Sequence, residues 1–171
     1  MALVGTAMQD IDDYQPEARI TPRLIESLYI EAMLLADEAR AYFDEAGREE
    51  RTTLDSFVRV GFACESLKVT TRIMHIVAWL LTQKAVESGE INPGSERRPD
   101  RRLGHAGDSD EAVVVQLPAT AQRLVSASQD LYARVKRLDE EASAETPVTS
   151  PARALMGRLE RDLFSGRDLT A

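Results

Sequence analysis

The stretch from about residue 53 to 88 constrains the fold most, because it has the period of one long α-helix with two apolar rows. It contains no proline, and at a rise of 1.5 Å per residue it would be roughly 50 Å long. A helix that is apolar on two sides has to be covered on two sides. One row advances in alternating steps of three and four residues and comprises Phe57, Val60, Cys64, Leu67, Thr71, Met74, Ala78, Leu81 and Ala85. The second row, on a different face, comprises Val69, Ile73, Ile76 and Leu80.

These two rows predict what packs on the long helix. One face can lie against the helix that precedes it in the chain. The other face needs either a third helix or a second subunit, because an exposed apolar strip of this size would aggregate. We therefore expect the second row, Val69 to Leu80, to lie in a core or in a dimer interface.

Two further segments have the same helical period. The first runs over about 21–46, beginning at Thr21-Pro22, a hydroxyl cap followed by proline at the first helical position. We expect Gly47 to end it as a C-terminal glycine cap. The other runs over about 118–142, and a loop rich in proline and glycine, 89–117, precedes it. The predicted fold is all-α: an antiparallel three-helix bundle over 21–143 with one long central helix.

Both ends differ from this bundle. Residues 1–20 show no sustained period and carry several acidic side chains, which predicts a flexible acidic arm. Residues 144–171 are predicted to be a flexible tail, because two prolines in 146–151 prevent the third helix from continuing. Beyond them Leu155, Leu159 and Leu163 recur every fourth residue and predict a short amphipathic helix that docks on a partner or on its own bundle.

Charge narrows the range of partners. The net charge is −8, and residues 1–50 hold four Arg and twelve Asp or Glu, so the acidic excess belongs to the arm and the first helix. Binding to duplex nucleic acid is unlikely for such a chain, since it needs a basic face. The longest apolar stretch is too short to cross a membrane, and no signal-peptide pattern opens the chain. We expect a cytoplasmic protein without nucleic-acid or membrane partners.

Few residues have the chemistry for catalysis. The two histidines, His75 and His105, are far apart in sequence, and no Cys/His cluster, glycine-rich phosphate loop or nucleophile motif occurs. We expect no cofactor and no enzymatic activity. His75 is expected to pack at the edge of the core; the alternative is a phosphoacceptor in a phosphotransfer bundle. The single cysteine, Cys64, is expected to pack in the core.

Two groups of basic residues are candidates for partner binding. Lys68 and Arg72 lie one helical turn apart and could bind a partner carboxylate, or extend past the apolar row to solvent. Arg97, Arg98, Arg101 and Arg102 form a cluster in the loop, either as a docking patch or as a solvated loop.

The stretch from Glu65 to Ile91 resembles the central helix of the alphaproteobacterial regulators of CtrA degradation. The matching residues are Ser66-Leu67, Thr70-Thr71-Arg72, Met74, Ala78-Trp79-Leu80-Leu81, Gln83 and Gly89-Glu90. The first helix is also similar, in its acidic exposed face and its Tyr42-Phe43 ending before Gly47.

This resemblance implies a homodimeric three-helix bundle without enzymatic activity. It further implies an adaptor in regulated proteolysis that helps the ClpXP protease, directly or through a primed co-adaptor, take up a cargo such as a cell-cycle regulator. Two alternatives remain open: the phosphotransfer bundle using His75, and a purely structural helical dimer.

Overall fold

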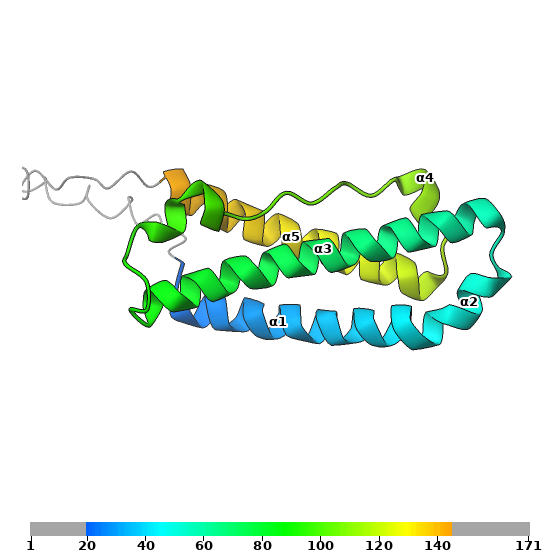
Figure 1. Ribbon diagram of the computed structural model, residues 1–171, viewed down its shortest axis with the longest axis horizontal. Helices are drawn as coiled ribbons and strands as arrows, with labels where there is room; N and C mark the ends of the chain where they lie inside the picture. Colours follow the sequence, from blue (N-terminus) through cyan, green and yellow to red (C-terminus); the bar gives the residue numbers. More distant parts are fainter. Residues whose placement is uncertain (1–19, 145–171) are drawn as a thin grey trace, which may run out of the picture.

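The computed structural model describes residues 20–144, and every regular element in that range is helical. The all-α fold with a long central helix is thus confirmed. Three long helices form a bundle: α1 (Pro22–Ala41), α3 (Ser56–Glu87) and α5 (Ala119–Ala144) (Figure 1). The expectations for the N-terminal arm, and for the tail beyond Ala144, lie outside the described residues. No helix in the described range is both long and apolar enough to cross a membrane.

The first helix begins as expected and ends later than expected. The Thr21 hydroxyl accepts a hydrogen bond from the Leu24 N–H at 3.2 Å, and Pro22 opens α1. At Gly47, however, the chain does not stop. It passes through a π-helical turn (Tyr42–Ala46) into α2 (Gly47–Thr53). A Cβ at Gly47 would lie 3.1 Å from the Tyr42 ring and 3.2 Å from the Phe62 ring, so this glycine allows close packing and does not cap a helix.

The long helix has clear signals at both ends. The Asp55 carboxylate accepts hydrogen bonds from the N–H groups of Phe57 and Val58, at 2.9 and 3.0 Å, and so caps its start. Ser88 ends α3, and the next residue, Gly89, has a positive φ of 79°. That conformation is one that glycine adopts readily, and Gly89 was the end expected from the sequence.

The direction of α5 differs from the prediction. Lys84 of α3 pairs with Glu26 at the start of α1, so α1 and α3 are antiparallel. In contrast, Arg72 contacts Ser128 and Trp79 contacts Asp139, so α3 and α5 run in the same direction. The antiparallel order therefore holds for α1 against each of the other two helices, and not for α3 against α5.

The connection between α3 and α5 explains this parallel pair. After two short 3-10 turns (Ser95–Arg97 and Pro99–Arg101), residues 102–110, here called the strap, run back along the bundle to α4 (Glu111–Val114) (Figure 1). Nine extended residues span about 30 Å, which returns the chain to the end where α3 began. The apolar run after the strap is a short helix and turn whose Val114 and Leu117 are buried.

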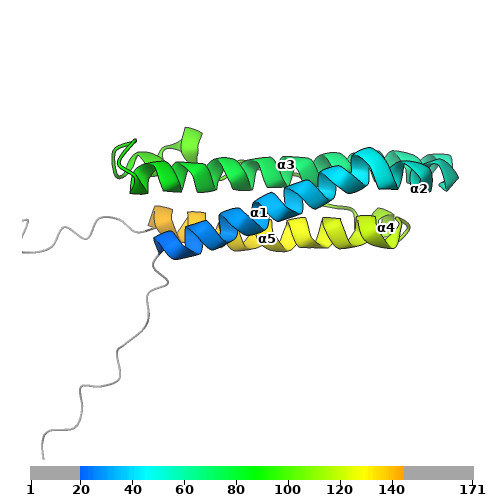
Figure 2. The ribbon, with the colours of Figure 1, turned by 90° about the horizontal axis from the view of Figure 1, so that it is seen from below.

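The core lies where α1, α3 and α5 meet. Val69, Ile76 and Leu80 of α3 are completely buried there, and Ile73 is 7% exposed. The second apolar row of the long helix is therefore a core row, covered by α1 and α5 of the same chain (Figure 2). From the flanking helices the core takes, among others, Ile25, Leu28, Ala32, Leu35, Ala121, Leu124, Leu131 and Val135.

Candidate protein-binding surface

The longer apolar row of α3 faces outward. Phe57 is 69% exposed, Val60 63%, Leu67 67% and Met74 60%. Periodicity makes this row look like a packing seam, yet neither α1 nor α5 covers it in the single chain. We call Phe57, Val60, Cys64, Leu67, Thr71, Met74, Ala78 and Leu81 the outward row. Isolated apolar residues are common on surfaces, but a continuous strip along one helix marks a contact site.

The position of Cys64 corrects one expectation. The sequence suggested a core cysteine, but its thiol belongs to the outward row and is exposed. The physical reason is that α1 and α5 cover only one of the two apolar rows of α3, and Cys64 lies on the row that they leave exposed. It is the only cysteine of the chain, so it has no partner for an internal disulfide.

An apolar groove adjoins the outward row. It lies between α1 and α3 and has a volume of about 560 Å³. Ala36 and Ala39 of α1 line one side, and small side chains there leave the surface hollow. Phe43, Ile73, Met74, Val77, Ala78 and Leu81 complete the apolar lining, with Thr70, Arg40 and Asp44 as its polar members. Three of these residues, Met74, Ala78 and Leu81, also belong to the outward row, so the groove widens that surface towards α1.

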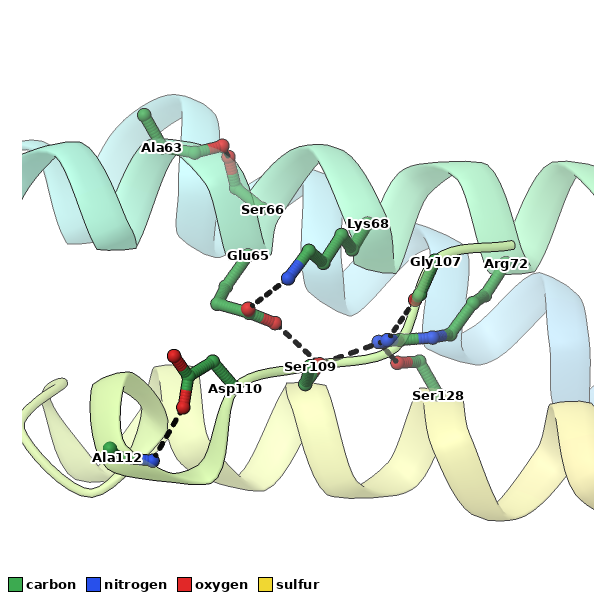
Figure 3. Close-up of polar contacts among 10 residues, drawn as sticks. All are labelled: Ala63, Glu65, Ser66, Lys68, Arg72, Gly107, Ser109, Asp110, Ala112 and Ser128. Atoms are coloured by element: carbon green, nitrogen blue, oxygen red, sulfur yellow. Dashed lines mark hydrogen bonds and ion pairs between the residues drawn. The ribbon is translucent and has the colours of Figure 1, made fainter.

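Arg72 is not accessible to a partner on the surface of this chain, because it is buried inside the fold with only 2% of its surface exposed. Its guanidinium donates hydrogen bonds to the Gly107 carbonyl at 2.7 Å, to Ser109 Oγ at 2.9 Å and to Ser128 Oγ at 3.3 Å (Figure 3). Burial lowers the pKa of Arg72, while the charges of Glu65 and Asp108 oppose this effect. The side chain ties the strap to both α3 and α5.

Glu65 completes this network from the other side. Its carboxylate accepts a hydrogen bond from Ser109 Oγ and pairs with Lys68 Nζ at 2.8 Å (Figure 3). Lys68 thus has an internal partner, although 30% of its side chain remains exposed. Glu65 is 2% exposed and was not identified from the sequence. The available signal was its position three and seven residues before Lys68 and Arg72, which places all three on one helix face.

The loop arginines divide into two groups. Arg102 pairs with Asp139 at 2.9 Å, and Asp139 also accepts a hydrogen bond from Trp79 Nε1 at 2.8 Å. This pairing raises the pKa of Arg102 and fixes the beginning of the strap. Arg98, in contrast, is exposed and pairs only with its neighbour Asp100 within the described chain. Arg97 and Arg101 lie in the adjacent turns, so these three arginines form the accessible part of the predicted patch.

His75 lies beneath the strap. A Cβ at Gly104 would be 2.1 Å from His75 Nδ1, so the imidazole ring is packed against this glycine. Tyr132 Oη donates a hydrogen bond to the Gly104 carbonyl at 2.7 Å and holds the strap in that position. The half-buried ring fits the expected role at the core edge. A phosphoacceptor histidine needs an exposed imidazole, and this arrangement does not offer one.

The remaining predicted site residues, Leu155, Leu159 and Leu163, lie outside the described residues. Within residues 20–144 there is no group of three or more His, Cys, Asp or Glu side chains that could hold a metal ion. The main feature that the described surface offers a partner is therefore the outward row with its adjoining groove, together with the exposed arginines at one end of the bundle.

Comparison with known proteins agrees with the resemblance seen in the sequence. Residues 17–163 match a family described as a protein of unknown function (DUF1465). Among solved structures, the chain is similar to the crystal structure of RcdA from Caulobacter crescentus CB15, with 32% sequence identity and a TM-score of 0.61. The similarity covers 75% of this chain and 97% of the RcdA chain. None of the curated proteins matches it. The chain is therefore an RcdA-like member of the DUF1465 family.

Proposed function

We propose that this protein is a non-enzymatic adaptor in regulated proteolysis, which acts as a homodimer and helps deliver a cell-cycle regulator to the ClpXP protease. The observation that carries the proposal is the outward row of α3, an uncovered apolar strip on a helix whose other side is already packed. Membership of the RcdA-like family supports the choice of pathway. The cargo and a possible primed co-adaptor are partners in the same proposal.

The outward row fits a second copy of the chain. Two copies related by a twofold axis present the same strip to each other, so every apolar residue meets an apolar partner. Phe57, Val60 and Leu67, the large apolar members of the row that lie outside the groove, are each between 63% and 69% exposed, and burial of such side chains contributes roughly 25 cal/mol for each Å² removed from water. The steps of three and four residues are those of a two-helix seam.

An adaptor needs further surfaces for the protease side and for the cargo. The exposed Arg97 and Arg98 and the half-buried Arg101 lie at the end of the bundle where α3 ends, away from the middle of the outward row. A dimer would carry two such patches and could bind two molecules at once. Holding cargo and protease together raises the effective concentration of one near the other, and this needs no change in any covalent bond.

Dimerisation is tested by the double substitution Val60→Glu/Leu67→Glu. Both side chains are mostly exposed in the single chain, so the fold should be retained while two charges enter the proposed interface. We expect the wild type to sediment as a dimer and the variant as a monomer with the same helical circular dichroism. Gln129→Glu, an exposed position on α5, is the matched control and should remain dimeric. An unchanged mass for the double variant would contradict the proposed interface.

The adaptor role needs a separate measurement. Purified ClpXP, a fluorescently labelled cell-cycle response regulator and the primed co-adaptor are combined with and without this protein. We expect the wild type to accelerate degradation of the regulator, and an Arg97→Ala/Arg98→Ala/Arg101→Ala variant to accelerate it less. A purely structural dimer would leave the rate of degradation unchanged.

A further inference from the structure

The groove between α1 and α3 is shaped for one more short helix. Its lining includes Ala36, Ala39 and Ala78, whose small side chains allow a close approach, and larger apolar side chains such as Phe43 and Met74. This is the form of a surface that accepts the apolar face of an amphipathic helix. The exposed sides of Met74 and Leu81, at 60% and 48%, show that the groove is uncovered within residues 20–144.

The chain itself contains a segment of the required pattern. Leu155, Leu159 and Leu163 recur every fourth residue, so a helix over 153–164 would present them in one row. The family match extends to residue 163, so this segment is part of the region that defines the family and not an appended end. A helix so short is marginal in water and forms when it has a surface to pack on.

The segment can reach the groove. Ala144, at the end of α5, lies at the same end of the bundle as the start of α1 and the end of α3 (Figure 2). Asp139 is level with Trp79, which places Ala144 near the level of Lys84, about 15 Å along the axis from Met74. Passing around a helix pair requires roughly 20 Å across the axis, and the two displacements, being at right angles, combine to about 25 Å. Ten residues separate Ala144 from Leu155, and an extended chain of that length spans about 33 Å.

Charge also favours this occupant. A second, smaller hollow shares Arg40 and Asp44 with the groove and is also lined by Asp37 and Glu45. The segment carries three arginines, Arg153, Arg158 and Arg161, and two acidic residues, Glu160 and Asp162, so its net charge is 3 − 2 = +1. When arginines beside an apolar row pair with carboxylates beside the groove, the ion pairs fix the direction in which the helix binds.

We propose that residues 153–164 of this chain dock as a short helix in the α1/α3 groove of the same molecule, with Leu155, Leu159 and Leu163 facing its apolar lining. The docked segment covers Met74, Ala78 and Leu81 and leaves Phe57, Val60 and Leu67 of the outward row free. This proposal goes beyond the adaptor role and does not depend on it.

Limited trypsin digestion of the full-length protein tests the docking. Arg161 lies in the segment and Arg167 lies beyond it, and each is followed by an aspartate, so the two bonds are matched substrates. Docking protects a bond because cleavage then requires local opening. We expect cleavage after Arg161 to be about tenfold slower than cleavage after Arg167. The groove substitution Ala78→Arg should abolish this difference, and Met74→Glu, a second exposed groove position, should do the same.

The Val60→Glu/Leu67→Glu variant is the control, because neither residue lines the groove. We expect it to keep the protection, and the protection to be independent of protein concentration. Three results would overturn the proposal: equal cleavage rates in the wild type; protection that survives Ala78→Arg, which would place the segment elsewhere; and protection that is lost on dilution or in the control variant, which would assign the groove to a second copy. The first two can occur with the proposed dimer intact, so the two proposals are tested separately.

Discussion

Individual polar residues hold the strap against the bundle. Arg72 joins it to α3 and α5 near its end, Tyr132 near its middle, and Arg102 with Asp139 at its beginning. The strap has no regular secondary structure, so its backbone groups need such partners when water is excluded. Because the buried charges of Glu65 and Arg72 lie in the same network, each depends on the other for compensation.

Removing the Arg72 charge should therefore lower the stability of the fold substantially. Arg72→Met keeps much of the volume but removes the donor to Ser109, Ser128 and the Gly107 carbonyl, and leaves Lys68 as the one cation beside the buried Glu65 carboxylate in this network. We expect the free energy of unfolding, measured with urea, to fall by about 2–4 kcal/mol. Arg98→Met is the control: this arginine is exposed and pairs with Asp100, so the change should be below about 0.5 kcal/mol. Equal effects of the two substitutions would show that the network contributes little.

The contact between Gly104 and His75 gives a second prediction at this scale. Gly104→Ala places a methyl group within 2.1 Å of the His75 ring position, so the strap must shift. We expect a loss of about 1–3 kcal/mol in stability, and part of it should be recovered when His75→Ala is added. Gly107→Ala, in the same strap, has nothing within 4 Å of the new Cβ and should be nearly neutral. A double-mutant cycle on Gly104 and His75 without coupling would contradict the contact.

At the scale of elements, α3 is the helix on which the others are arranged. Its core row meets α1 and α5, the Glu65 and Arg72 face meets the strap, and the outward row meets solvent. These faces lie on one uninterrupted helix. A charged substitution should therefore unfold the protein when it falls in the core row and leave the fold intact when it falls in the outward row.

Charges in the two rows of α3 should therefore behave differently. Ile76 is completely buried and Ile73 is 7% exposed, so Ile73→Glu/Ile76→Glu places two carboxylates in the core without partners. The cost of burying such charges is comparable to the whole stability of a domain, about 5–15 kcal/mol. We expect loss of the cooperative thermal transition seen by circular dichroism. The Val60→Glu/Leu67→Glu variant, with the same charge change, should melt cooperatively. If the Ile73→Glu/Ile76→Glu variant also melted cooperatively, these two residues would not lie in the core.

For the whole molecule, α1 is joined to its neighbours by ion pairs as well as by the core. Glu26 pairs with Lys84 of α3, while Glu31 and Glu38 pair with Arg134 and Arg123 of α5. The hydrogen bond from Arg123 lowers the pKa of Glu38 below its usual 4.5. A carboxyl group whose pKa is lower in the folded state stabilises the fold above its unfolded pKa, and this contribution is lost as the pH falls through the folded value.

This linkage predicts a small stability change at acid pH. In Glu38→Gln the contribution of the pair is absent at every pH. At pH 7 we expect the variant to be less stable by no more than about 0.5 kcal/mol, because both side chains are about half exposed and solvent screens them. Once the pH lies below the folded-state pKa of Glu38, the two proteins should have equal stability. Urea unfolding at several pH values measures the difference, and Glu45→Gln, an exposed carboxylate in the π-helical turn that follows α1, serves as control. If the stability difference between the wild type and Glu38→Gln grew as the pH was lowered, the predicted contribution of the Glu38–Arg123 pair would be contradicted.

Neighbouring residues along the chain set where the helices form and which side chains share a face. Thr21-Pro22 and Gly89 mark helix ends through backbone geometry that only nearby residues influence, and the steps of three and four residues follow from the helical period. The all-α fold and the long central helix are therefore readable from the sequence. Gly47 shows where such local reading fails: a glycine typical of a helix end was instead required by the rings of Tyr42 and Phe62.

Long-range packing determines which apolar row of α3 lies inside and in which direction α5 runs. Both rows have the same period, so periodicity cannot choose between them; the choice depends on which faces α1 and α5 offer. The direction of α5 depends on the path of the strap, which the composition of a loop does not reveal. Likewise the partners of Arg72 lie 35 to 56 residues further along the chain, and no local pattern connects residues so distant. Its burial, and with it the correction of the predicted binding site, follows from packing.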